Sequence, residues 1–233
     1  MIPRHDACIL AGGLARRLGG RDKPGLRVLG RPLVESVAAA VPGAERLIVV
    51  GPPRPGLPGA IFRREEPPGA GPVPALRAGL AEVTAPWVVL LAADLPFLTP
   101  EHVSALLAVA DAGPRSGAGT GAPAPGAETG AVPGGAGEAG VPRSGAVLVD
   151  DDGRPQWLVG VWRTEVLAGA LARYEGRSLH GLLAPLSPVT FQLAGRPWFD
   201  CDTMDDLQRA RSGEPGPTSG AGPRGAGATA YEE

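Results

Sequence analysis

The chain has 233 residues, of which 43% are hydrophobic and 20% charged, and its formal net charge is −2. This length allows one sizeable core, and a nearly neutral chain lacks the basic patch of proteins that bind nucleic acid or a membrane surface. Two cysteines are too few for a disulfide framework, and the charged start MIPRHDACIL is unlike a signal peptide. No apolar run approaches the roughly 18 residues of a membrane span. We therefore expect a reduced, cytoplasmic protein without nucleic-acid or membrane partners.

Short apolar runs alternate with helical patterns in the first half of the chain. The apolar runs, which are typical of strands buried on both faces, cover residues 7–10, 46–50, 60–63 and 87–93. Helices are predicted between and after them at 32–40, 74–82 and 100–110, the last with Thr99 as its N-cap. This order indicates an α/β fold with a mostly parallel sheet, in which ligands bind beyond the carboxyl ends of the strands.

Two segments rich in Gly, Ala and Pro interrupt or follow this pattern. Their composition cannot repay the entropy of ordering, so we expect a flexible low-complexity insertion at 113–145 and a disordered tail at 212–233. The predicted domain therefore spans residues 1–211, with the insertion inside it.

The second half resumes with strand patterns at 146–150 and 156–162 around the acidic turn DDDG, which favours a hairpin over a metal site. A helix is predicted at 164–174 and a strand at 189–193. The segment WFDCDTMDDLQRA is then predicted to pass from strand to helix, with Thr203 as the N-cap.

The stretch LAGGLARRLGGRDKPG, which begins at Leu10, follows the first predicted strand. Gly12 and Gly13 allow the backbone to turn tightly and to approach a ligand, and the arginines with Lys23, the only lysine of the chain, offer cations for phosphates. Neither a Walker A loop nor a dinucleotide fingerprint fits, because Asp22 precedes the lysine and the glycine spacing differs. The alternative is a glycine-rich surface turn with solvated arginines.

Two acidic segments are candidates for a metal site. Asp94 ends a strongly apolar strand, where a carboxylate needs compensation, and Mg²⁺ favours such ligands; the alternative is that it caps the next turn. Asp200 and Asp202 alternate along a predicted strand end and so point to one side, where one of them would add a second metal carboxylate. Helix N-terminal electrostatics is the alternative for this pair.

In this order, LAGGLARRLGGRDK, GPVPAL, DLPFLTP, PQWLVGVWR and FDCDTMDDL resemble the molybdenum cofactor guanylyltransferase family and its relatives in the nucleotidyltransferase superfamily. The resemblance implies a three-layer, Rossmann-like fold of the glycosyltransferase-A type. It also implies transfer of GMP from GTP to molybdopterin with release of pyrophosphate, Mg²⁺ as cofactor, and a molybdoenzyme or another cofactor-biosynthesis protein as partner.

The resemblance also implies roles for individual residues. Guanine and ribose would be held by the backbone of the first loop, the triphosphate by two cations, and the metal by two aspartates. The resemblance assigns the base and ribose to the backbone of Leu10, Ala11, Gly12 and Gly13. It assigns the triphosphate to Arg17 and Lys23, and the metal to Asp94 and Asp202.

Several positions depart from the family pattern. The loop opened by Gly71 has Pro74 and Ala75 where the family has a small Ala-Gly pair, and Glu65 or Glu66 replaces the aspartate that reads the base. Asp202 stands where the guanylyltransferases usually have Asn and the cytidylyltransferases Asp. Alternatives are therefore a sibling enzyme that uses CTP or another phosphorylated acceptor, and a non-catalytic GTP-binding module.

Overall fold

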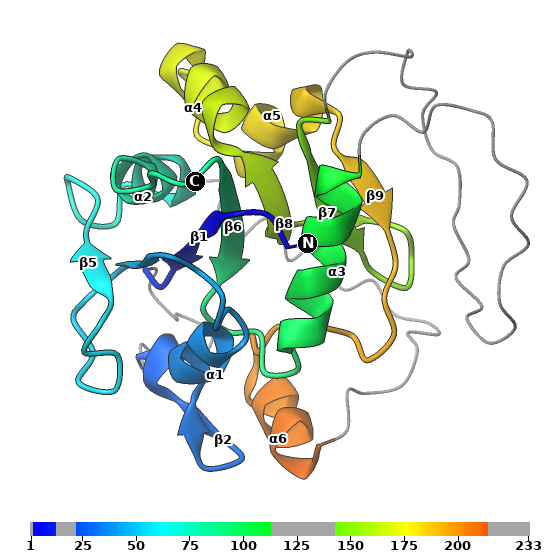
Figure 1. Cartoon of the computed structure of the whole chain (residues 1–233). Coiled ribbons are helices and arrows are strands. Elements are labelled where there is room, and N and C mark those ends of the chain that lie inside the picture. The colour runs from blue at the N-terminus through cyan, green and yellow to red at the C-terminus, as the bar shows by residue number, and fades with distance from the viewer. Residues whose placement is uncertain (1, 13–21, 113–142, 214–233) are drawn as a thin grey trace, which may run out of the picture.

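The structure, a computed structural model, describes residues 2–12, 22–112 and 143–213 (Figure 1). Gly13, Arg17, nearly all of the predicted insertion and the tail from residue 214 lie outside the described residues. Gly145, predicted to lie in the insertion, already belongs to a strand, and Ser212, predicted to lie in the disordered tail, is the last residue of a helix. No helix in the described ranges combines the length and the apolar character needed to cross a membrane.

A seven-stranded sheet with the order β5-β4-β1-β6-β8-β7-β9 forms the centre of the described part of the chain. Strands β5, β4, β1 and β6 pair in parallel, β8 is antiparallel to β6 and β7, and β9 is parallel to β7. The sheet is therefore mostly parallel, as predicted. The strand bounds are β1 His5–Leu10, β4 Leu47–Val50, β5 Ile61–Arg63, β6 Trp87–Ala92, β7 Gly145–Val149, β8 Pro155–Arg163 and β9 Val189–Phe191.

Helices cover both faces of this sheet and give three layers. Apolar side chains of α1 and α3 pack with alternate residues of β1 on one face, and those of α2, α4 and α5 pack with the intervening residues on the other. In Figure 1, α4 and α5 lie at the top and α1 and α6 at the bottom. The helix bounds are α1 Leu33–Ala39, α2 Pro72–Leu80, α3 Pro100–Asp111, α4 Thr164–Arg173, α5 Leu179–Leu183 and α6 Met204–Ser212.

Local signals account for several element ends. Thr99 and Thr203 are the N-caps of α3 and α6, and both belong to capping boxes, as an extended residue with a short hydroxyl side chain allows. The DDDG segment forms the predicted hairpin turn, in which Asp150 Oδ1 accepts hydrogen bonds from the backbone N–H groups of Asp152 and Arg154. These caps and this turn are confirmed.

Some elements differ from the prediction. Helix α2 begins at Pro72, two residues early, because Gly71 with its φ of 106° reverses the chain just before it. The strand predicted directly before α6 is wrong: residues 198–202 are irregular, because they run along the loop after β6 rather than along a sheet edge. The two-residue strands β2 (Arg27–Val28) and β3 (Arg31–Pro32), and the short helix α5, were missed.

Close packing of α2 on the sheet gives a stability prediction. A Cβ at Gly79 would lie 2.5 Å from Cys8 Sγ and 2.8 Å from Val50 Cγ2, both on buried strands. We expect Gly79→Ala to lower the free energy of unfolding by about 1–3 kcal/mol, as overpacking does, despite the better helix propensity of Ala. Urea denaturation monitored by circular dichroism measures the change.

Gly169 in α4 is the matched control, since a Cβ there meets only the flexible end of Arg173 at 3.7 Å. Gly169→Ala should leave the protein equally stable or add about 0.5–1 kcal/mol through helix propensity. Equal effects of the two substitutions would contradict close packing of α2 against β1 and β4.

Candidate functional site

The first residues after the adjacent parallel strands β1 and β6 lie at one edge of the sheet, where β4 also ends. After β1, the N–H of Ala11 donates to the carbonyl of Val50 at the end of β4, over 2.8 Å. After β6, the N–H of Ala93 donates to the carbonyl of Leu10, over 3.2 Å. These bonds bring Gly12 and Asp94 to the same carboxyl edge, where α/β sheets bind ligands.

Glu65 lies beside Gly12, which comes just after β1. Its side chain is buried, with only 7% of the residue exposed, and a Cβ at Gly12 would be 3.8 Å from Glu65 Oε1. Oε1 also accepts a hydrogen bond from the N–H of Gly69 over 2.8 Å, which fixes the carboxylate. Glu66 is exposed, so of the two glutamates left open by the sequence, Glu65 is the one that faces Gly12.

A cavity of about 600 Å³ opens beside the start of α2. Gly71 lies in its wall, and the segment from Tyr174 to Arg177, which follows α4, also lines it. Arg77 of α2, which also lines the cavity, donates to the Leu171 carbonyl at 3.0 Å and to the Tyr174 carbonyl at 3.5 Å, and so ties α2 to the end of α4. The 174–177 wall could not be predicted from the sequence, because no motif marks it.

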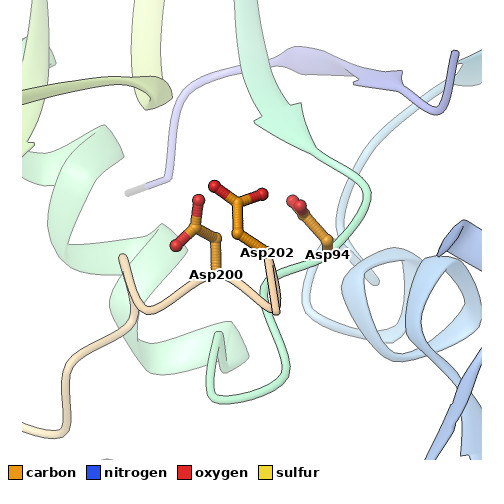
Figure 2. A group of neighbouring side chains, drawn as sticks. All are labelled: Asp94, Asp200 and Asp202. Carbon is orange, nitrogen blue, oxygen red and sulfur yellow. The ribbon is translucent and has the colours of Figure 1, made fainter. Parts of the chain in front are cut away.

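Three carboxylates converge at the end of β6. Asp94, Asp200 and Asp202 each offer an oxygen, and these oxygens all lie within 4.8 Å of one another. Figure 2 shows their side chains pointing to the same side of two neighbouring loops. The loops are joined by a backbone hydrogen bond of 3.3 Å from the N–H of Cys201 to the carbonyl of Asp94. This bond, rather than a strand, sets the direction of the Asp200 and Asp202 side chains.

Lys23 reaches the same carboxylates from the other end of the chain. Its Nζ donates to Asp202 Oδ1 at 2.5 Å and forms an ion pair with Asp94, and the three side chains are only 14–25% exposed. Burial lowers the pKa of Lys23, but the charges of Asp94 and Asp202 outweigh it, so the net pKa is raised. The ammonium is therefore fully charged at neutral pH.

The cluster brings three carboxylates close to a single ammonium, that of Lys23, so a further cation would offset the remaining negative charge. Desolvation, together with repulsion from Asp94 and Asp202, raises the pKa of Asp200. Because the residue as a whole is exposed, we attribute the shift chiefly to its acidic neighbours. Burial raises the pKa of the Cys201 thiol to about 12, which excludes a thiolate there at neutral pH. The candidate chemistry thus belongs to the carboxylates and Lys23.

The fold and this site define a class: an α/β protein whose lysine and carboxylates gather at the carboxyl ends of parallel strands, as in nucleotide-binding enzymes. The family model described as "MobA-like NTP transferase domain" matches residues 7–189. The chain belongs to this family, which confirms the resemblance drawn from its motifs.

Named relatives agree with this family. A molybdenum cofactor guanylyltransferase from Bradyrhizobium sp. (strain ORS 278) is 38% identical over 87% of this chain and 89% of its own length. A probable molybdenum cofactor guanylyltransferase from Deinococcus radiodurans is 37% identical over 46% of this chain and 55% of its own. Several curated relatives are matched over only 55 to 61% of their length, little more than half.

Solved structures support the fold. The crystal structure of molybdopterin-guanine dinucleotide biosynthesis protein A from Archaeoglobus fulgidus has a TM-score of 0.61, with 20% identity over 89% of this chain and 97% of that chain. At this identity the likeness shows the architecture alone. It confirms the predicted three-layer α/β fold with its mostly parallel sheet.

Proposed function

We propose that this chain is a nucleotidyltransferase that moves GMP from GTP to molybdopterin and releases pyrophosphate. The observation that carries the proposal is the meeting of Lys23 with Asp94 and Asp202 at the carboxyl edge of the sheet, the edge at which Gly12 also lies. The names of the relatives supply the substrates. A cytoplasmic location and delivery of the product to a molybdoenzyme complete the proposal.

The donor set fits a magnesium ion. Asp94 and Asp202 would hold it, with Asp200 close enough to add an oxygen, and Mg²⁺ is bound through few protein carboxylates plus phosphate oxygens. The ion would supply positive charge to the triphosphate. It would also relieve the mutual repulsion of carboxylates whose oxygens lie within 4.8 Å of one another.

The reaction needs alignment and charge more than a base. A phosphate oxygen of the acceptor, already anionic at neutral pH, attacks the α-phosphorus of GTP. As this P–O bond forms, the bond from the α-phosphorus to the oxygen bridging to the β-phosphate breaks, and pyrophosphate leaves with the electron pair. Lys23 and Arg17 would neutralise the oxygens on which negative charge grows, and Gly12 and Gly13 would let the backbone approach the nucleotide.

Glu65 supports guanine as the base. Guanine presents two neighbouring donors on its pairing edge, the ring N–H and the exocyclic amine, which match an ionised carboxylate that only accepts. Oε1 of Glu65 already accepts from Gly69, so the remaining lone pairs of the group are the ones available to a base near Gly12. Cytosine presents one amine beside two acceptors, which would leave its acceptors facing the carboxylate. This contrast favours GTP over CTP.

Pyrophosphate release with each of the four nucleoside triphosphates, with Mg²⁺ and with or without molybdopterin, tests the proposal. We expect release only when GTP and molybdopterin are both present. Release with CTP instead would assign the chain to the cytidylyl-transferring siblings. Binding of GTP without turnover on molybdopterin would contradict the proposal and favour another acceptor or a non-catalytic module.

A further inference from the structure

Arg54 lies in the connection between β4 and β5 and holds the segment that carries Lys23. Its guanidinium pairs with both oxygens of Asp22: Nη2 donates to Oδ1 at 2.5 Å, and Nη1 pairs with Oδ2. The Arg54 side chain is only 14% exposed. The hydrogen bonds and charge of Arg54 lower the pKa of Asp22, and those of Asp22 raise the pKa of Arg54. The pair is therefore ionised and bidentate, a geometry that fixes orientation as well as distance.

The Arg54 side of this pair has firm support. The carbonyl of Arg54 accepts from the N–H of Leu57, whose side chain packs against the main core. At Gly56 a Cβ would overlap Glu35 Oε1 of α1, so the loop and that helix are in close contact. At Gly51 a Cβ would lie 2.8 Å from the carbonyl of Ala11, which places the loop's start against the first glycine segment.

The Asp22 side leads directly to Lys23. Asp22 precedes the short 3-10 turn Lys23–Gly25, and its carbonyl accepts from the N–H of Gly25 at 3.1 Å. The ion pair packs against Gly25, where a Cβ would overlap Asp22 Oδ2 and lie 3.0 Å from Arg54 Nη1. The Arg54 guanidinium thus holds Asp22, the residue that begins the turn in which Lys23 lies.

We propose that Arg54 is a positioning residue that acts through Asp22 to place the Lys23 ammonium among the site carboxylates. The placement of Lys23 by Arg54 does not depend on the proposed function. Only the effect of that placement on turnover rests on the proposed function. Removing the guanidinium frees the start of the turn, and the lysine then samples positions away from Asp94 and Asp202. A displacement of about 1 Å in a catalytic group can cost up to a hundredfold in rate.

The first test uses the fact that Lys23 is the only lysine in the chain. Protein labelled with ¹³C,¹⁵N-lysine gives one backbone amide signal and one side-chain Cε signal, both from Lys23. We expect both signals to shift or broaden in Arg54→Ala and in the milder Asp22→Asn. Signals at their wild-type positions in both variants would overturn the proposal. This readout needs no turnover, so it stands even if the proposed function fails.

Arg4→Ala is the matched control. Arg4 forms a bidentate pair of the same kind with Glu45, at 2.6 and 3.0 Å, at the opposite end of β1. Loss of that pair should leave the Lys23 signals and the turnover number unchanged. Lys23 signals that move equally in Arg4→Ala and Arg54→Ala would show a general loss of structure and overturn the specific role.

The second test is a double-mutant cycle on the turnover number. Arg54→Ala alone should lower kcat about 10- to 100-fold, with partial recovery in Arg54→Lys. In a Lys23→Ala background the same change should cost less than about twofold, because coupled residues are not additive. Losses that multiply in the double variant would show that Arg54 acts independently of Lys23 and would overturn the proposal.

Discussion

Asp94→Asn is expected to reduce pyrophosphate release at least a hundredfold while the protein stays folded. Asparagine keeps the shape of the side chain but removes the charge that would hold Mg²⁺ and that pairs with Lys23. The backbone bond between Asp94 and Cys201 does not involve the carboxylate, so the two loops should stay together. Turnover with GTP and molybdopterin, alongside thermal unfolding, measures both parts.

Asp152→Asn serves as the control for that result. Asp152 is an exposed aspartate in the β7–β8 turn, 3.4 Å from Arg154, and it has no part in the site. Its substitution should leave turnover within about twofold, since exposed ion pairs contribute little. Asp94→Asn activity within tenfold of wild type would remove Asp94 from the catalytic machinery.

Lys23→Met is expected to lower kcat by about 10²- to 10³-fold, the usual cost of losing one group that stabilises transition-state charge. Methionine is unbranched and of similar reach, so it tests the charge rather than the space. Lys23→Arg should retain part of the activity, because it keeps the charge but spreads it over a broader group. Steady-state kinetics with GTP and molybdopterin separates kcat from KM.

Lys23→Met also gives a prediction that does not depend on turnover. Without the ammonium, the oxygens of Asp94, Asp200 and Asp202 remain within 4.8 Å of one another with no lysine to offset their charge. The melting temperature in EDTA should therefore fall, and Mg²⁺ should raise it more in the variant than in the wild type. An equal response to Mg²⁺ in both proteins would contradict a shared site for the lysine and the metal.

Elements fixed by neighbouring residues could be predicted from the sequence, whereas segments fixed by tertiary contacts could not. Strands β1, β4 and β6 were predictable because runs of at least four consecutive apolar residues are satisfied only when both faces are buried. Strand β5 was also predicted to be buried on both faces, but it has only three apolar residues in a row and lies half-buried or exposed at the sheet edge. The caps at Thr99 and Thr203 were predictable because a cap depends on residues three positions apart. Helix α5 was missed because five residues are too few to show a helical period, and the strand before α6 was wrong because tertiary contacts, not propensity, set that segment.

The sequence by itself determined which residue types were present for the chemistry: a glycine loop after the first strand, a single lysine, and aspartates at the ends of apolar or capped segments. Only the tertiary structure decided which of them meet. Lys23 and Asp202 are 179 residues apart, and no local rule pairs them. Glu65 rather than Glu66 faces Gly12, and Arg54 reaches Asp22, because loop closure and sheet topology bring these side chains together. Ion pairs between residues far apart in the sequence depend on how their loops are placed in the fold, and that placement depends on packing throughout the domain.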